Sequence, residues 1–207
     1  MTAARTHRPP RRELLAFGRS DRIGLVLLLG AAGLAAAGTW VLVPLLAWVG
    51  GSDLPVPFAS EVSVPALDAA GVRYSDAQYL LHLTDPTSGQ RLLHLLPGVG
   101  FTAVVVVAAA LVARLVRDVG RNDPFTPVNV RRLRVLGLLL LVAWPVVTLV
   151  QFAADAAVLA GHDLGELGSS FRFELPVGVM LAGMVAGLLA EAFAAGSRLR
   201  DDVDGLV

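Results

Sequence analysis

Few residues of this chain combine types and spacings that could do chemistry, and three histidines are the first of them. His82, His94 and His162 are expected on one side of the protein, near acids such as Asp85 and Asp163. Zinc and copper sites use such side chains, but no spacing here matches a known ligand motif. We therefore expect polar packing roles for the histidines, and we predict neither a metal nor another cofactor.

Composition restricts the remaining catalytic chemistries. The sequence has no cysteine, and all 17 of its basic residues are arginine. This excludes thiolate catalysis, disulfides, iron–sulfur clusters and Schiff-base lysines. No cluster of His, Asp or Ser is predicted to face one cavity, so we do not expect an enzyme. The 17 acidic residues balance the arginines, so the net charge indicates no partner.

The elements that must position any functional residues are unusually apolar. Of the 207 residues, 55% are hydrophobic and 16% are charged, whereas soluble domains carry about 25% charged residues. A helix needs about 20 mostly apolar residues to cross a bilayer, and its backbone must be bonded within the segment. We predict an all-α polytopic membrane protein with four transmembrane helices at residues 23–49, 95–116, 133–158 and 175–197.

The first apolar run resembles a secretory signal only at its start. It is too long for the hydrophobic part of a signal peptide, so we expect an uncleaved span. Trp40 and Trp48 are expected at the outer membrane interface, where amphipathic rings settle. Pro145 is expected to kink the third helix.

Arginine placement predicts the orientation. Residues 1–22 carry six arginines and residues 114–134 another six, whereas the loops 50–94 and 159–174 carry two and one. The positive-inside rule then places residues 1–22, the loop 117–132 and the tail 198–207 in the cytoplasm, in a multi-pass protein of the plasma or inner membrane. The bilayer is thus an expected partner, with anionic headgroups at the arginines. Direct nucleic-acid binding is not expected, because the arginines abut the membrane.

The two outer loops are too short to bury cores of their own, but they carry strand-like pieces. Ser60–Val64 and Phe171–Leu175 alternate polar and apolar residues, and Tyr79–Leu83 precedes a strong turn signal. We predict a small β-containing extracytoplasmic cap, in which Phe171–Leu175 pairs with strands of the first loop.

Polar residues at membrane depth are costly and mark candidate sites. Glu191 and Arg114 are expected at similar depths, where they would form an interfacial ion pair; a proton or ion relay through Glu191 is the alternative. Asp155 falls at the outer boundary of the third helix, where it is expected to face water or cap the helix end. Gln151, one turn earlier, is expected to bond across helices.

A GxxxG spacing in the fourth helix is formed by Gly183 and Gly187. Small residues let helix backbones approach closely in lipid. We favour packing within the bundle, and a homodimer through the same face is the alternative.

Two further segments carry residue patterns that a membrane-spanning role alone does not explain. Residues 123–134 contain a Pro-Phe…Asn…Arg-Leu-Arg pattern, and residues 189–207 contain a Glu-x-Phe…Gly…Asp pattern. The residues of these patterns are Pro124, Phe125, Asn129, Arg132 and Arg134 in the loop, and Glu191, Gly196 and Asp202 in the tail. Together the two segments resemble the family of bacterial membrane proteins called domain of unknown function 2975.

The resemblance extends over residues 20–207 and implies a four-helix inner-membrane protein without an established activity. Members of that family often look like neighbours of small helix-turn-helix regulators, so the resemblance also implies a signalling pair with such a regulator. Ala194 stands where the family tail commonly has an arginine, so any role of that charge is absent here.

The pattern residues are interpreted as a structural clamp between loop and tail, with a partner-docking surface as the alternative. We expect Thr126 and Pro127 to cap and start an extension of the third helix. Phe125 is expected to lie between helix ends, and Arg132 to pair with the acids of the tail. The predicted function is a non-enzymatic sensor or accessory protein that engages a cytoplasmic partner through this loop and tail. A small transporter or immunity-type membrane protein is the alternative.

Overall fold

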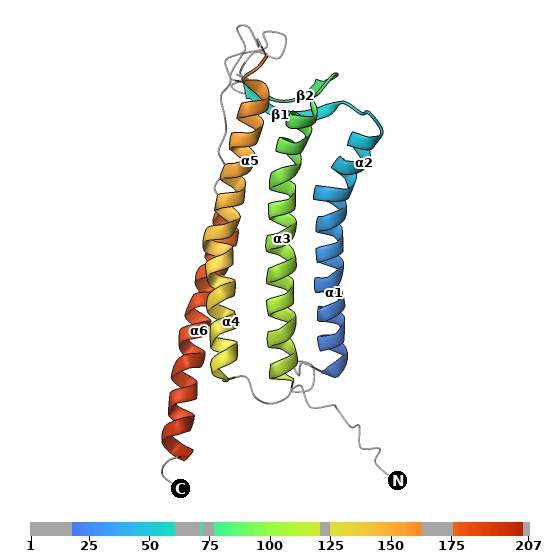
Figure 1. The fold of residues 1–207 in the computed structure, drawn as a ribbon. Helices are drawn as coiled ribbons and strands as arrows, with labels where there is room; N and C mark the ends of the chain where they lie inside the picture. Colours follow the sequence, from blue (N-terminus) through green and yellow to red (C-terminus); the bar gives the residue numbers. More distant parts are fainter. Residues whose placement is uncertain (1–17, 61–70, 72–76, 121–124, 163–175, 205–207) are drawn as a thin grey trace.

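Four long helices make up most of the computed structural model, which describes residues 18–60, 71, 77–120, 125–162 and 176–204. All four are long and apolar enough to cross a membrane, which confirms the predicted fold class. The first is continuous through three elements and so is the third, whereas the second and fourth are single helices (Figure 1). Their bounds are α1 Arg19–Ala37, η2 Gly38–Leu42 and α2 Val43–Val49; α3 Ser88–Val119; α4 Pro127–Leu138, η4 Leu139–Ala143 and α5 Trp144–Leu159; and α6 Val177–Asp204.

The first three helices start before the apolar runs, whereas α6 starts at Val177, two residues after its predicted start. Polar side chains cap the early starts of α3 and α4. The Thr87 hydroxyl accepts a hydrogen bond from the backbone N–H of Gln90 (3.3 Å), whose side-chain oxygen accepts one from the backbone N–H of Thr87 (2.8 Å). This reciprocal capping box begins α3 seven residues before the predicted start at residue 95. The third helix begins as predicted, with Thr126 as its cap and Pro127 at its first position.

The two prolines inside the first and third helices each follow a wide turn. The five-residue π-helical segments η2 and η4 end two residues before Pro44 and Pro145. A proline inside a helix lacks the N–H and clashes with the carbonyl four residues earlier, and a π turn relieves that crowding. Pro145, expected to kink the third helix, is thus accommodated by a local widening of the helix. The Ala36 carbonyl beside η2 accepts a hydrogen bond from the Thr102 hydroxyl of α3 (3.3 Å).

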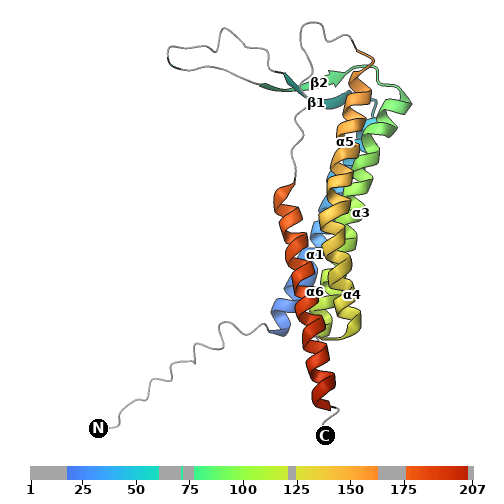
Figure 2. The same cartoon turned by 90° about the vertical axis from the view of Figure 1, so that its left-hand side faces the viewer.

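Neighbouring helices pack in the order first, second, third, fourth. The first helix packs on α3, α3 packs on α5, and α6 packs on α4 and η4 (Figure 1). Figure 2 shows α6 crossing α4 and then diverging from α5 towards the other end. The fourth helix is therefore held mainly by the first half of the third.

An aromatic cluster joins the first three helices near their middle. The ring centroids of Trp40, Phe101 and Trp144 lie 5.2–6.4 Å apart. Gly98 permits this approach, since a Cβ atom there would lie 2.2 Å from the Trp40 carbonyl oxygen. Trp40 therefore packs between helices, whereas it was expected at the outer interface beside Trp48.

A two-stranded antiparallel sheet forms the cap at one end of the helices. Strand β1, Leu54–Ser60, pairs with β2, Ala77–Leu83, in a register that sets Leu54 opposite Leu83. The buried side chains of Leu54 and Val56 pack on Val158 and Leu159 of α5. The sheet therefore covers the end of the third helix.

The sheet confirms part of the predicted cap. Tyr79–Leu83 forms most of β2, but the first strand ends at Ser60, where the prediction had it begin. Strand β1 is instead built on the alternation Leu54-Pro55-Val56-Pro57, in which buried aliphatic residues alternate with prolines. Both prolines fall on one edge of the strand. Residues 61–64 and the predicted strand Phe171–Leu175 lie outside the described residues.

Candidate functional site

The pattern residues of the loop and tail meet where α4 begins and α6 nears its end. The Phe125 ring, just before α4, lies 5.1 Å from the Phe193 ring, centroid to centroid. It also covers Gly196, where a Cβ atom would lie 3.1 Å from the nearest ring carbon. Phe125 thus lies between helix ends, and a residue larger than glycine at position 196 would press on its ring. We call this contact of Phe125, Phe193 and Gly196 the loop–tail clamp.

A glycine-lined crossing continues the contact between α4 and α6. A Cβ atom on Gly183 would lie 2.9 Å from the Gly137 carbonyl oxygen and 2.9 Å from the Leu141 nitrogen. A Cβ atom on Gly137 would lie 2.9 Å from the Gly183 carbonyl oxygen and 3.1 Å from the Gly187 nitrogen. The GxxxG pair therefore meets a third glycine of the same chain, backbone against backbone. Gly137 was not singled out from the sequence, although an isolated glycine within a helix is a signal of close packing.

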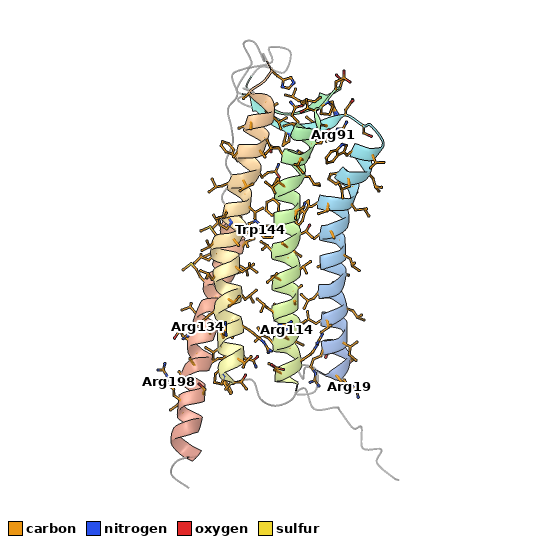
Figure 3. The ribbon with its side chains drawn as sticks, viewed as in Figure 1. Arg19, Arg91, Arg114, Arg134, Trp144 and Arg198 are labelled. Carbon is orange, nitrogen blue, oxygen red and sulfur yellow. The ribbon has the colours of Figure 1, made fainter. Side chains whose placement is uncertain are left out.

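Glu191 pairs with Arg134, so the predicted pair with Arg114 is wrong. The Arg134 Nε and Nη2 atoms donate to one Glu191 oxygen at 3.1 and 2.9 Å. The two side chains are 55% and 64% exposed. Arg114 lies on α3, which is separated from α6 by the third helix (Figure 3).

A second polar group joins the end of α3 to the start of α4. Asn129 is fully buried, and its side-chain oxygen accepts a hydrogen bond from Arg132 Nη1 (2.8 Å). The same Arg132 nitrogen forms an ion pair with Asp118 of α3. Arg132 was expected to pair with the acids of the tail, and that expectation is wrong. Asp118, the observed partner of Arg132, was not predicted. The sequence offered a signal for it, because Asp118 is one of only two acidic residues among residues 114–134.

Two of the pattern residues cannot be placed in this arrangement. Pro124 lies outside the described residues, and Asp202 lies in α6 with its side chain outside them. The remaining six fall into three contacts: the loop–tail clamp, the exposed Arg134–Glu191 pair and the part-buried Asn129–Arg132–Asp118 group. The three contacts fasten α4 to both of its neighbours.

At the other end of the third helix, Asp155 is buried against α3. Its Oδ1 atom lies 3.8 Å from His94 Nδ1, and the two side chains are 9% and 19% exposed. Gln151 donates to the other oxygen, Oδ2, at 2.8 Å. Neither of the two facing atoms has a hydrogen-bond partner within 3.5 Å, so two buried polar atoms face each other without a direct bond.

This His94–Asp155 pair overturns two expectations. Asp155 was expected to face water or cap a helix end, but it is buried, and its two oxygens face His94 and Gln151. Gln151 was expected to bond across helices, but it bonds one turn along its own helix. The pair also depends on the early start of α3, which places His94 inside the helix.

The surroundings of the histidines contain two small cavities. His94 lines one of about 110 Å³ beneath β1, together with Asp53 and Arg91. Arg91 Nη2 donates to the Ser52 carbonyl (2.8 Å), which ties α3 to the turn before β1. His82 and His162 line a separate cavity of about 340 Å³. Across the part of the chain that the structure describes, no three His, Asp or Glu side chains are grouped to hold a metal ion.

The two ends of the molecule differ in charge. The starts of α1 and α4 and the ends of α3 and α6 lie together, and we call this the arginine-rich end (Figure 3). Within the described residues, the cap end has Arg91 alone, whereas Arg19, Arg114, Arg134 and Arg198 all lie towards the arginine-rich end.

Comparison with known proteins places the chain in one family. The family model described as "Protein of unknown function (DUF2975)" matches residues 57–207. The matched range includes the loop–tail clamp, the glycine crossing and the His94–Asp155 pair, while the first span lies outside it. No curated protein and no solved structure matches the chain. Since the match covers well over half of its length, the chain belongs to the DUF2975 family.

Proposed function

We propose that this integral membrane protein is a non-enzymatic sensor or accessory protein, which passes the state of its cap to a cytoplasmic partner. One observation carries the proposal: a single helix joins the two polar sites. The third helix contributes Asp155 to the buried pair beneath the cap and Asn129, Arg132 and Arg134 to the contacts at the arginine-rich end. From Arg134 to Asp155 it rises about 30 Å, which is the thickness of a bilayer core.

The arginine-rich end is the cytoplasmic end in this proposal. Its support is the positive-inside rule, applied to ends that the fold brings together. The cap then faces the outside of the cell membrane, and changes there reach the His94–Asp155 pair first. A buried, imperfectly bonded polar pair is sensitive to any shift of the helices that hold it.

A partner would dock where α4 begins and α6 ends. Several side chains there are exposed although they flank the contacts just described, and these are Phe125, Val128, Arg131, Arg198 and Leu199. The last turns of α6 extend beyond the start of α4 (Figure 1), so they present a helix surface outside the bundle. A cytoplasmic protein with an apolar and acidic surface complements this set. The family resemblance suggests a small helix-turn-helix regulator.

Affinity capture of the full chain tests the proposal. Leu199 and Leu181 are both exposed leucines of α6, at its end and near its start. We expect Leu199→Ala to reduce, and removal of residues 200–207 to abolish, recovery of a specific cytoplasmic protein. Leu181→Ala, the matched control, should leave recovery unchanged. Equal recovery of every cytoplasmic protein by all variants would count against a docking role.

The transporter alternative makes a different prediction at Glu191. A relay residue would alter flux when Glu191→Gln is introduced, without loss of folding. The support for this alternative is weaker, since Glu191 is bonded to Arg134 on an exposed face of α6. A flux assay in vesicles with Arg134→Gln as control separates a relay from an ion pair, because only the carboxylate would carry the proton.

A further inference from the structure

A groove between the start of the first helix and the end of the second has no role in the contacts described so far. It encloses about 670 Å³ between α1 and α3 at the arginine-rich end. Three arginines line it, Arg19, Arg22 and Arg117, and its walls include the apolar side chains of Val26 and Val116. The groove thus has a cationic part and an apolar part.

The three arginines lack counter-ions among the described residues. The nearby acids are engaged elsewhere: Asp21 accepts a hydrogen bond from the backbone N–H of Gly18 (2.8 Å), and Asp118 pairs with Arg132 of α4. Arg22 makes a weak contact, from Nε to the Gly18 carbonyl at 3.4 Å. Within the described part of the chain, three positive charges therefore share one groove without a carboxylate to neutralise them.

The groove is shaped by a glycine at the end of α3. A Cβ atom on Gly120 would lie 1.8 Å from Arg22 Nη1. Any larger residue there would push the guanidinium away from α3. Gly120 thus lets Arg22 lie across the helix end, on the same groove as Arg117.

We propose that this groove binds one anionic phospholipid, with its phosphate held by Arg19, Arg22 and Arg117. Guanidinium groups bind phosphate through paired hydrogen bonds, and basic pockets between transmembrane helices on the cytoplasmic side suit anionic headgroups. An acyl chain would continue along the apolar wall at Val26 and Val116. The ligand therefore needs both a phosphate group and an acyl chain. Free phosphate would contact the arginines but leave the apolar wall without a partner.

The N-terminal segment and the tail complement the groove poorly. Residues 1–17 contain four arginines and one glutamate, so they would add positive charge. The acids at the end of α6 lie on the far side of the third helix, and Figure 3 places Arg19 and Arg198 at opposite sides of the molecule. A second copy of the chain could still bring its acidic tail to this groove, and the experiment below distinguishes that case.

Native mass spectrometry of the full-length protein from phosphatidylcholine nanodiscs, titrated with phosphatidylglycerol, tests the proposal. The groove variant combines Arg19→Gln, Arg22→Gln and Arg117→Gln. The control variant makes the same charge change at three exposed arginines of the same end, and these are Arg114, Arg131 and Arg198. We expect one retained phosphatidylglycerol in the wild type and the control. Affinity should fall by roughly fivefold per groove arginine, about 100-fold in total.

Several results would overturn the proposal. Equal weakening in both triple variants would mean diffuse attraction to the surface, and equal retention of phosphatidylcholine would remove the role of charge. Competition by millimolar inorganic phosphate alone would mean a phosphate site without a lipid chain. A change in dimer content without a change in lipid retention would assign the groove to a second copy. If the triple variant fails to fold, Arg117→Gln against Arg114→Gln gives the same comparison, with about a fivefold difference expected.

Discussion

The crossing of α4 and α6 gives the sharpest test of the fold, because it separates two glycines of one motif. Gly183→Ala places a methyl group 2.9 Å from two backbone atoms of the third helix, which cannot move as a flexible side chain would. Gly187→Ala places the same group where no atom lies within 4 Å. The two substitutions are chemically identical and lie one turn apart on the same helix.

The expected magnitude follows from that geometry. Contacts of 2.9 Å are shorter than real Cβ contacts, so α6 must shift and lose packing along α4; overpacking of this kind costs about 1–3 kcal/mol. Gly187→Ala should change the free energy of unfolding by less than about 0.5 kcal/mol, as expected of a substitution that meets nothing. Gly137→Ala should match Gly183→Ala, because its methyl group would lie 2.9 Å from the Gly183 carbonyl oxygen.

Thermal unfolding in mild detergent, followed by circular dichroism, measures the difference. We expect a Tm lowered by several degrees for Gly183→Ala and Gly137→Ala, and an unchanged Tm for Gly187→Ala. A parallel size measurement reports oligomeric state. The reasoning is refuted if Gly187→Ala costs as much as Gly183→Ala, or if both change dimer content without changing Tm, since the motif would then face another copy.

Three further pairs of substitutions test the polar and aromatic contacts. Asp155→Ala should lower the free energy of unfolding by about 1–3 kcal/mol, because it leaves the part-buried Gln151 amide without its acceptor, whereas Asp155→Asn keeps an acceptor and should cost less. Denaturation in detergent measures both. Arg132→Gln should destabilise more than Arg134→Gln, since the Arg132 pair is 22% and 26% exposed and the Arg134 pair is mostly exposed, where ion pairs contribute about 0–1 kcal/mol. An equal effect on Tm would contradict this ranking. Gly196→Ala should displace the ring that covers it and speed proteolysis of the adjoining loop, whereas Gly178→Ala meets nothing within 4 Å and should not.

The four spans could be predicted because a bilayer demands long apolar runs, and such runs are visible in any sequence. Their starts were less predictable, since they depend on caps beyond the apolar run. The Thr87–Gln90 capping box was legible as Thr-Ser-Gly-Gln, yet it lies in a segment that reads as a turn. Strand β1 was not predicted because it contains Pro55 and Pro57. Proline cannot donate a backbone hydrogen bond, so it is unfavourable in a strand unless its edge of the strand is unpaired.

Side-chain partners were harder to predict than spans. The positions of small residues decide which helices pack together, and a hydropathy profile does not show which faces of the helices carry them. Glu191 was assigned to Arg114 by depth alone, whereas the contact between Gly137 and Gly183 sets α6 beside α4 and gives Glu191 to Arg134. The His94–Asp155 pair needed two facts that lie outside any local pattern, the early start of α3 and the cover of the sheet.

The narrow crossing at Gly137 and Gly183 also determines how far movement is magnified. The two helix backbones are in direct contact there, with no side chains between them, so the crossing is the fulcrum about which α6 would tilt. The arm of α6 from Gly183 to Asp204 is about 30 Å long by helix rise. A tilt of about 5° at the fulcrum would swing the tip of that arm sideways by about 3 Å, which is comparable to the diameter of a water molecule. Because Glu191 and Phe193 lie on this arm and contact Arg134 and Phe125, such a tilt would also displace the ion pair and the loop–tail clamp, so the last turn of α6 cannot move without them.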